Sequence, residues 1–260
     1  AAGLPLYQYI GAYRRSLPVY ASGLFHEDPQ EYVREALYYK SRGINCYKAH
    51  PSGPWELDME IHENIRKAVG PDMKLMSDPV AEYTLEEAVR VGRHLEKLGY
   101  EWLEEPFRDF ELNKYTQLCA ALDIPIAATE TTRGCHWGVA QVINQKAADI
   151  VRADVSWKSG VTGTLKIAHL AESFGMQCEI HTTTMNYMDL VNLHVSCAIR
   201  NCRYFEYFVP EEDFMFPMKG LLPIDEKGII TVPDKPGIGG ELDWELIERN
   251  CVSHQMEVLE

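Results

Sequence analysis

Apolar runs of strand length recur along the chain, and each is rich in β-branched or aromatic residues. The runs close on polar or turn-forming residues, which is typical of buried strands. We therefore expect eight strands, at residues 17–23, 44–50, 74–80, 100–106, 125–131, 149–155, 177–183 and 203–208.

The segments between these runs show the periodicity of amphipathic helices. The clearest one opens with a capping box at Thr84 and Glu87, carries an apolar stripe from Leu85 to Leu98 and ends before Gly99. Eight strands alternating with seven helices predict a closed parallel barrel rather than an antiparallel sandwich. The expected fold class is α/β, a TIM-type barrel of modified (β/α)7β form with its active site at the C-terminal ends of the strands.

The pattern predicts one main domain. No change of composition and no Ser- or Gly-rich linker divides the chain. We expect a lead-in segment at residues 1–16 and the catalytic barrel at residues 17–219. Residues 220–260 contain many Pro and Gly and predict an extended tail. Within that tail, residues 243–250 predict a short helix that packs on the barrel.

Composition narrows the class of protein. The 260 residues carry a net charge of −14, which argues against a nucleic-acid partner because such binding needs a basic face. No apolar run approaches the roughly 18 residues of a membrane span, and no signal-peptide pattern opens the chain, so no membrane partner is expected. The seven cysteines lack paired spacing and indicate a reducing compartment. We expect a cytoplasmic protein.

Ionisable residues recur at the C-terminal ends of the expected strands, where barrel active sites lie. They are Lys48, Asp78, Glu104, Glu130, Asp154, His181 and Glu206, spaced 24 to 30 residues apart. A lone Glu at a strand end is more often a solvated loop residue, and a lone buried His is more often part of the core. Seven such positions in register favour a functional site instead.

Three of these residues predict a metal site. Neighbouring strands lie about 4.8 Å apart, so Asp78, Glu104 and Glu130 can converge on one cation. An all-oxygen set of three carboxylates suits Mg²⁺ or Mn²⁺ better than zinc. We expect Glu105 to point the other way, because adjacent strand residues face opposite sides and Pro106 favours an extended conformation before it.

The metal is expected to have a candidate base on either side. Lys48 and His50 are two residues apart on one strand and share a face. Asp154 and His181 come from neighbouring strands, so a hydrogen bond between them can fix the imidazole tautomer and raise the basicity of the ring.

These motifs resemble those of the enolase superfamily, and within it the mandelate racemase-like group. The resemblance covers nearly the whole chain from about Gly3. It rests on K-A-H at 48–50, Asp78, W-L-E-E-P at 102–106, A-A-T-E at 127–130, D-I-V-R-A-D-V at 149–155, E-I-H at 179–181, F-E-Y at 205–207 and V-P-D-K-P-G-I-G at 232–239.

The resemblance implies that the three carboxylates bind Mg²⁺, which holds the carboxylate of a small-molecule substrate. It further implies that His181 and Asp154 form a catalytic dyad and that Glu206 hydrogen-bonds the substrate carboxylate. A proton next to a carboxylate is a weak acid, so the enediolate left by its removal needs a cation and nearby donors. We expect Lys48 to be one such donor and a protonated Glu206 to be another.

Three departures from the family pattern bear on the reaction. His50 stands where the second lysine of the motif is usual, and its role as base, acid or hydroxyl ligand stays open. Val80 stands where Asn is frequent, and Lys158, Ser159 and Gly160 replace a more usual pair of glycines.

The preferred reaction is dehydration of a sugar acid to a 2-keto-3-deoxy acid, which is the work of a lyase. The alternative is an isomerase, a racemase or epimerase of a 2-hydroxy acid, since His50 leaves a group on the second flank. A third possibility is a non-catalytic metal-binding barrel. The chain begins where the barrel of the resembled family begins, so we expect its N-terminal capping domain to be absent or supplied by another segment.

Weaker signals mark four further positions as substrate contacts. Arg133, His136 and Trp137 follow Glu130 in the expected fifth loop, and Thr182 follows His181. Solvated loops explain these residues about equally well. Exposed Tyr and Phe positions are compatible with a homo-oligomer.

Overall fold

Eight parallel strands form the centre of the fold. The computed structural model describes residues 2–51, 53–182, 186–214, 216–220 and 222–253. The strands are β1 (Ser16–Gly23), β2 (Cys46–Ala49), β3 (Lys74–Ser77), β4 (Trp102–Glu104), β5 (Ile126–Ala128), β6 (Ile150–Ala153), β7 (Gln177–Ile180) and β8 (Phe205–Val209). Each lies within or beside an expected run, although residue 183 of the seventh run lies outside the described residues.

The strands lie side by side in chain order, and the sheet curls back on itself. β1 pairs in parallel with both β2 and β8, and the remaining neighbours are also parallel as far as β7. Between β7 and β8 the described residues form no ladder, but the Cys178 amide donates to the Asn201 carbonyl at 2.8 Å. The expected α/β, TIM-type arrangement is confirmed.

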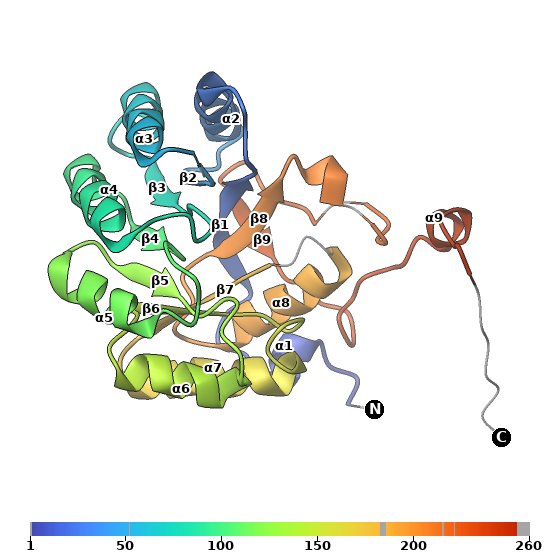
Figure 1. Cartoon of the computed structure of the whole chain (residues 1–260). Helices are drawn as coiled ribbons and strands as arrows, with labels where there is room; N and C mark the ends of the chain where they lie inside the picture. Colours follow the sequence, from blue (N-terminus) through green and yellow to red (C-terminus); the bar gives the residue numbers. More distant parts are fainter. Residues whose placement is uncertain (1, 52, 183–185, 215, 221, 254–260) are drawn as a thin grey trace.

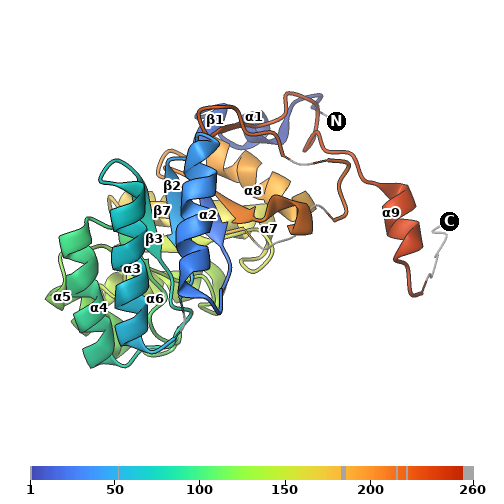
Figure 2. The ribbon, with the colours of Figure 1, turned by 90° about the horizontal axis from the view of Figure 1, so that it is seen from above.

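In the described parts of the chain, seven helices connect these strands and lie along the outside of the curved sheet (Figures 1 and 2). They are α2 (Pro29–Ser41), α3 (Trp55–Val69), α4 (Leu85–Leu98), α5 (Leu112–Ala121), α6 (Cys135–Asn144), α7 (Gly160–Ser173) and α8 (Asn186–Ala198). α4 has the predicted capping box between Thr84 and Glu87, and Gly99 ends it with a φ of 67°.

The interior of the barrel is filled below the site by an apolar layer of Tyr20, Cys46, Met76, Trp102, Ala127 and Ile150. Side chains two residues apart on a strand share a face. The next inward-facing positions after Cys46, Met76, Trp102 and Ile150 are therefore polar, namely Lys48, Asp78, Glu104 and Arg152. An apolar floor thus carries a charged layer at the C-terminal ends of the strands.

The two ends of the chain add elements outside this repeat. α1 (Leu6–Ile10) precedes β1, η1 (Glu211–Phe214) follows β8, and β9 (Ile229–Thr231) pairs antiparallel with β1. The predicted C-terminal helix forms as α9 (Trp244–Arg249), but none of its residues is buried and it stands away from the barrel (Figure 1). The expected packing of this helix on the barrel is not seen in the described chain: Trp244 is 63% exposed, and Leu246 and Ile247 are only partly covered. Residues 254–260 lie outside the described residues.

No helix in the described ranges is long and apolar enough to cross a membrane.

His62 on α3 gives a testable pH dependence. It is fully buried, its Nε2 lies 2.7 Å from the Ser77 hydroxyl oxygen, and burial lowers its pKa to about 3. The unfolded pKa is about 6.5, so the folded state loses stability as the pH falls below that value and the unfolded state takes up the proton. As the pH is lowered, we expect the unfolding free energy of the wild type to fall more steeply than that of His62→Gln. The two slopes should differ by about 1.4 kcal/mol per pH unit.

The measurement is urea unfolding of both proteins between about pH 6 and pH 4. Glutamine can retain a hydrogen bond to Ser77 but does not titrate. Equal slopes for the two proteins would show that His62 does not resist protonation in the folded state.

Candidate active site

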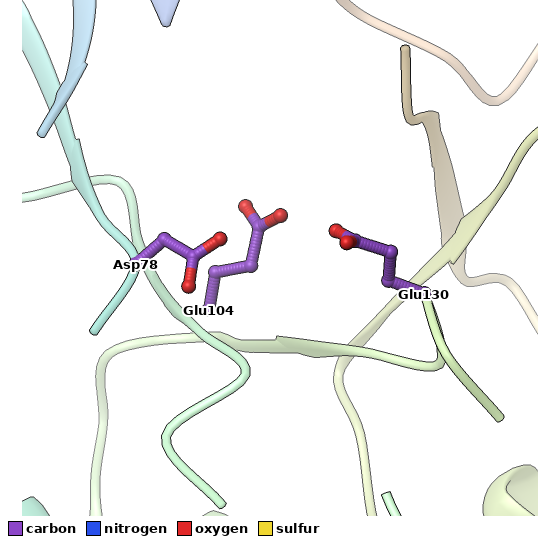
Figure 3. A group of neighbouring side chains, drawn as sticks. All are labelled: Asp78, Glu104 and Glu130. Atoms are coloured by element: carbon purple, nitrogen blue, oxygen red, sulfur yellow. The ribbon is translucent and has the colours of Figure 1, made fainter. Parts of the chain in front are cut away.

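Three carboxylates from neighbouring strands converge at the C-terminal end of the barrel (Figure 3). One ligand oxygen from each of Asp78, Glu104 and Glu130 lies within 4.8 Å of the others. Asp78 follows β3, Glu104 ends β4 and Glu130 follows β5. The Val80 amide donates to Asp78 Oδ1 at 2.9 Å and helps to fix that carboxylate. An oxygen-only set of three negative charges fits a hard divalent cation such as Mg²⁺.

Glu105 stays out of this group, as expected, but for a different reason. Its backbone is not extended, because its φ is 40°, in the left-handed region. The side chain is buried, and its Oε1 accepts a hydrogen bond of 3.0 Å from the Glu130 amide. Burial and the neighbouring charges of Glu130 and Asp78 raise the pKa of Glu105 well above its usual value. Glu105 therefore supports the backbone at Glu130.

The two adjacent glutamates should respond differently to the same substitution. We expect Glu104→Gln to weaken Mn²⁺ binding by about tenfold or more. Even the mutation of residues that only orient metal ligands typically lowers metal affinity by about 10- to 100-fold. Glu105→Gln should leave binding within about threefold, because a glutamine oxygen can accept the same amide hydrogen bond. Titration of each protein with Mn²⁺, followed by electron paramagnetic resonance, measures both affinities. Equal losses would place Glu105 among the ligands.

His181 and Asp154 lie on one flank of the carboxylates. His181 Nδ1 is 3.1 Å from Asp154 Oδ2, and His181 Nε2 is 3.4 Å from Glu130 Oε1. The other oxygen of Asp154 accepts the amides of Ser156 and Trp157 at 2.6 and 2.8 Å. Burial alone would lower the pKa of His181, but Glu130 and Asp154 raise it. A proton held on Nδ1 by Asp154 leaves Nε2 as the reactive nitrogen.

Lys48 and His50 lie on the opposite flank. Lys48 Nζ is 2.9 Å from Glu104 Oε1 and 2.8 Å from Glu206 Oε1. Burial opposes the charge of Lys48, but these two carboxylates raise its pKa above the usual value. His50 Nδ1 contacts the Gly23 carbonyl, and His50 Nε2 is 3.4 Å from Asp78 Oδ2. Lys48 is therefore a cationic donor rather than a base, while His50 Nε2 stays beside the carboxylates.

The expectation that Glu206 is protonated is wrong. Burial would raise its pKa, but ion pairs with Arg152 and Lys48 hold the pKa well below its usual value. Arg152 Nη2 is 2.6 Å from Glu206 Oε2. An ionised carboxylate only accepts hydrogen bonds, so Glu206 cannot donate one to a substrate carboxylate. Its position instead anchors Lys48.

A cavity of about 320 Å³ opens between the two flanks. Its ionisable lining consists of Lys48, His50, Asp78, Glu130, His181 and Glu206, and its apolar lining consists of Leu24, Phe25, Val80, Trp157 and Phe208. Thr182 also lines it, and the buried Thr182 hydroxyl has no hydrogen-bond partner within the described residues. Since buried hydroxyls are normally paired, this group is suited to a bound molecule.

The other predicted substrate contacts lie elsewhere. Arg133 lines a neighbouring cavity of about 820 Å³, which shares Asp78, Val80 and Glu130 with the first. His136 and Trp137 are on α6, where their rings lie 3.9 Å apart, and neither lines these two cavities as far as the described chain shows. Their contact with substrate stays a prediction.

Arg152 and Trp157 are among the residues of the site that were not singled out from the sequence. Arg152 is fully buried and contacts both Glu104 and Glu206. The signal for it was a charged residue inside the apolar run at 149–155, two positions before Asp154 and hence on the same face. Trp157 lies with its ring 4.9 Å from that of His181. Nothing in its sequence context distinguishes it from a surface aromatic.

The departures from the family pattern have local structural effects. Val80 adopts a φ of 55°, a left-handed conformation that asparagine tolerates and a β-branched residue disfavours. Ser159 has a φ of 63°, where a glycine would be unstrained. Lys158 is buried and its Nζ donates to the Thr132 carbonyl, so it ties the loop after β6 to the loop after β5.

The fold and this constellation of charges agree with comparisons to known proteins. The sequence model of the family described as "Enolase C-terminal domain-like" matches residues 31–246. The chain belongs to this family. The resemblance seen in its motifs, to the mandelate racemase-like group of the enolase superfamily, is thereby confirmed.

Among its relatives, arabinonate dehydratase of Saccharolobus solfataricus is 32% identical over 90% of this chain, and L-Ala-D/L-Glu epimerase of Bacillus subtilis is 28% identical over 91%. The structure of D-glucarate dehydratase from Agrobacterium tumefaciens, complexed with magnesium, covers 96% of this chain with a TM-score of 0.88 and 37% identity. The chain spans 64% and 65% of the two relatives and 69% of the structure. These relatives include both dehydratases and an epimerase.

Proposed function

We propose that this barrel removes the proton next to the carboxylate of a sugar acid and then eliminates water. The observation that carries the proposal is one cavity lined by His181 on one side and Lys48 on the other, with Asp78 and Glu130 between them. Asp154 holds His181 from outside this lining, and Glu104 completes the group of three converging carboxylates. The dehydratase relatives support the same reaction class.

The residues present fit a bound Mg²⁺ at Asp78, Glu104 and Glu130. When bound there, it supplies positive charge against the negative charge that develops on the substrate carboxylate as the proton leaves. Lys48 adds a second positive charge on the side away from His181. Because its pKa is raised by Glu104 and Glu206, Lys48 stays charged throughout and acts as a hydrogen-bond donor.

His181 carries the proton in this proposal. Its Nε2 takes the proton from C2, and Asp154 stabilises the imidazolium through Nδ1. The imidazolium then gives that proton to the C3 hydroxyl, the C3–O bond breaks and water leaves. The resulting enol converts to a 2-keto-3-deoxy acid. One proton moves from C2 to the departing oxygen, so no oxidant or reductant is required.

Epimerisation is the second candidate, and His50 favours it. His50 lies on the flank opposite His181, and both rings line the same cavity. Two groups on opposite faces of C2 can remove a proton from one side and return one to the other. The L-Ala-D/L-Glu epimerase of Bacillus subtilis, 28% identical to this chain, supports this second candidate.

We further propose that a separate segment covers the mouth of the cavity. Phe25, Val80 and Trp157 line the cavity and are 56%, 55% and 54% exposed. Large apolar side chains that are exposed around a polar site are typical of an interaction surface. A covering segment would also exclude water from the developing charge.

The test is a screen of acid sugars with this chain and Mg²⁺, assayed for 2-keto acid. Proton NMR of each reaction distinguishes loss of water from inversion at C2. Formation of a 2-keto-3-deoxy acid supports dehydration, and inversion without keto acid supports the epimerase. Metal binding without either product would leave a non-catalytic barrel and contradict the proposal.

A further inference from the structure

Arg152 occupies the centre of the charged layer. It lies on β6, it is fully buried, and its Nε is 2.9 Å from Glu104 Oε1. Its Nη2 is 2.6 Å from Glu206 Oε2, and its Nη1 donates to the Tyr20 hydroxyl at 3.0 Å. The planar guanidinium therefore spans the gap between a metal-ligand candidate and the anchor of Lys48.

Lys48 bridges the same two carboxylates. Its Nζ lies 2.9 Å from Glu104 and 2.8 Å from Glu206. Lys48, Glu104, Arg152 and Glu206 thus form a closed ring of alternating charge, called here the charge ring, with a formal sum of zero. All four side chains are at most 1% exposed.

The remaining acceptor sites of the two carboxylates are also used. Trp102 Nε1 donates to Glu104 Oε2 at 2.8 Å. The Ser22 hydroxyl donates to Glu206 Oε1 at 2.9 Å, and the Thr182 amide donates to Glu206 Oε2 at 3.1 Å. Each carboxylate is consequently held by several donors in one orientation, which limits its freedom to turn toward or away from the cavity.

Stability alone is a poor reason to keep such a ring. A buried ion network is often no more stabilising than apolar residues of similar volume. The charge ring instead lies directly beneath the cavity and shares Lys48 and Glu206 with the cavity lining. Removing Arg152 would leave two buried carboxylates opposite one lysine, and burial of an uncompensated charge favours proton uptake.

We propose that Arg152 is a positioning residue that fixes Glu104 and Glu206 and thereby keeps Lys48 aimed at the substrate carboxylate. The catalytic part of this inference rests on the proposed function. Its structural part does not, because the orientation and ionisation of the ring can be measured without turnover.

The first test compares Arg152→Met with the wild type by infrared spectroscopy at neutral pH. We expect a new C=O stretching band of a protonated carboxyl group in the variant, and we expect Arg152→Met/Glu206→Gln to lack it. The matched control is Arg66→Met, which removes an arginine that donates to the backbone carbonyls of Leu98, Gly70 and Met73. Absence of the band, or a band that survives Glu206→Gln, overturns the proposal.

The second test uses Arg152→Lys, which preserves the charge and remains useful if the methionine variant does not fold. Lysine lacks the planar fork that reaches both carboxylates. We expect proton exchange at C2 of the substrate to fall at least about tenfold, measured at saturating Mn²⁺ so that a change of metal affinity through Glu104 does not contribute. Unchanged exchange would overturn the positioning role. A wild type that binds Mn²⁺ but exchanges no proton would contradict the proposed function, and the infrared result would still decide the role of Arg152 in the ring.

Discussion

Replacing His181 with asparagine is expected to lower turnover of the sugar acid by about 1,000-fold or more, since a positioned proton-transfer group contributes about 100- to 10,000-fold. His181 is the residue whose Nδ1 is held by Asp154 while its Nε2 faces the cavity. Asparagine can keep a hydrogen bond to Asp154 but cannot carry the C2 proton at neutral pH. Mn²⁺ binding should stay within about threefold, because the three carboxylates are unchanged.

The assay is kcat for 2-keto acid formation, paired with Mn²⁺ titration of the same protein. His169→Asn is the control, because His169 is an exposed residue on the outer helix α7. It should leave both quantities unchanged. Full activity in His181→Asn would contradict the assignment of the base, whichever substrate is used.

Replacing Lys48 with methionine is expected to abolish turnover and to destabilise the fold. Lys48 is 1% exposed and bridges Glu104 and Glu206, so its loss leaves Arg152 alone between two buried carboxylates. Breaking a buried ion pair costs about 3–5 kcal/mol. For a chain of this size each kcal/mol lowers Tm by about 2–4 °C. We therefore expect the melting temperature to fall by roughly 6–20 °C.

Thermal and urea unfolding measure this change directly. Lys114→Met is the control, since Lys114 forms an ion pair of 2.5 Å with Glu111 on the partly exposed surface of α5. Such pairs contribute about 0–1 kcal/mol. A loss below about 1 kcal/mol for Lys48→Met would mean that the charge ring does not depend on the lysine for its stability.

The positions of the strands could be predicted because each strand is a short apolar run between turn signals. The period of two along a strand then placed Lys48, Asp78 and Glu104 on the inner face, directly above apolar residues of the barrel floor. The contact between His181 and Asp154 was likewise predictable, since their strands are neighbours in chain order. These inferences needed only local pattern and strand adjacency.

Charge states and loop conformations could not be predicted in the same way. The ionisation of Glu206 depends on Arg152 and Lys48, which are distant in sequence and meet it only in the folded barrel. Glu105 was expected to be extended before Pro106, yet the turn after β4 gives it a positive φ. The position of α9 away from the barrel could not be predicted either. The apolar residues of a helix do not show which surface they will contact.

The central claim is that this barrel removes the proton at C2 of a sugar acid with a divalent metal bound. The most direct measurement is exchange of that proton with deuterium oxide, followed by proton NMR of a set of acid sugars. We expect exchange with at least one of them when Mg²⁺ is present, its loss on addition of a chelator and its return when Mg²⁺ is restored. Exchange at the rate of buffer alone, in a chain shown to bind Mn²⁺ at Asp78, Glu104 and Glu130, would contradict the account.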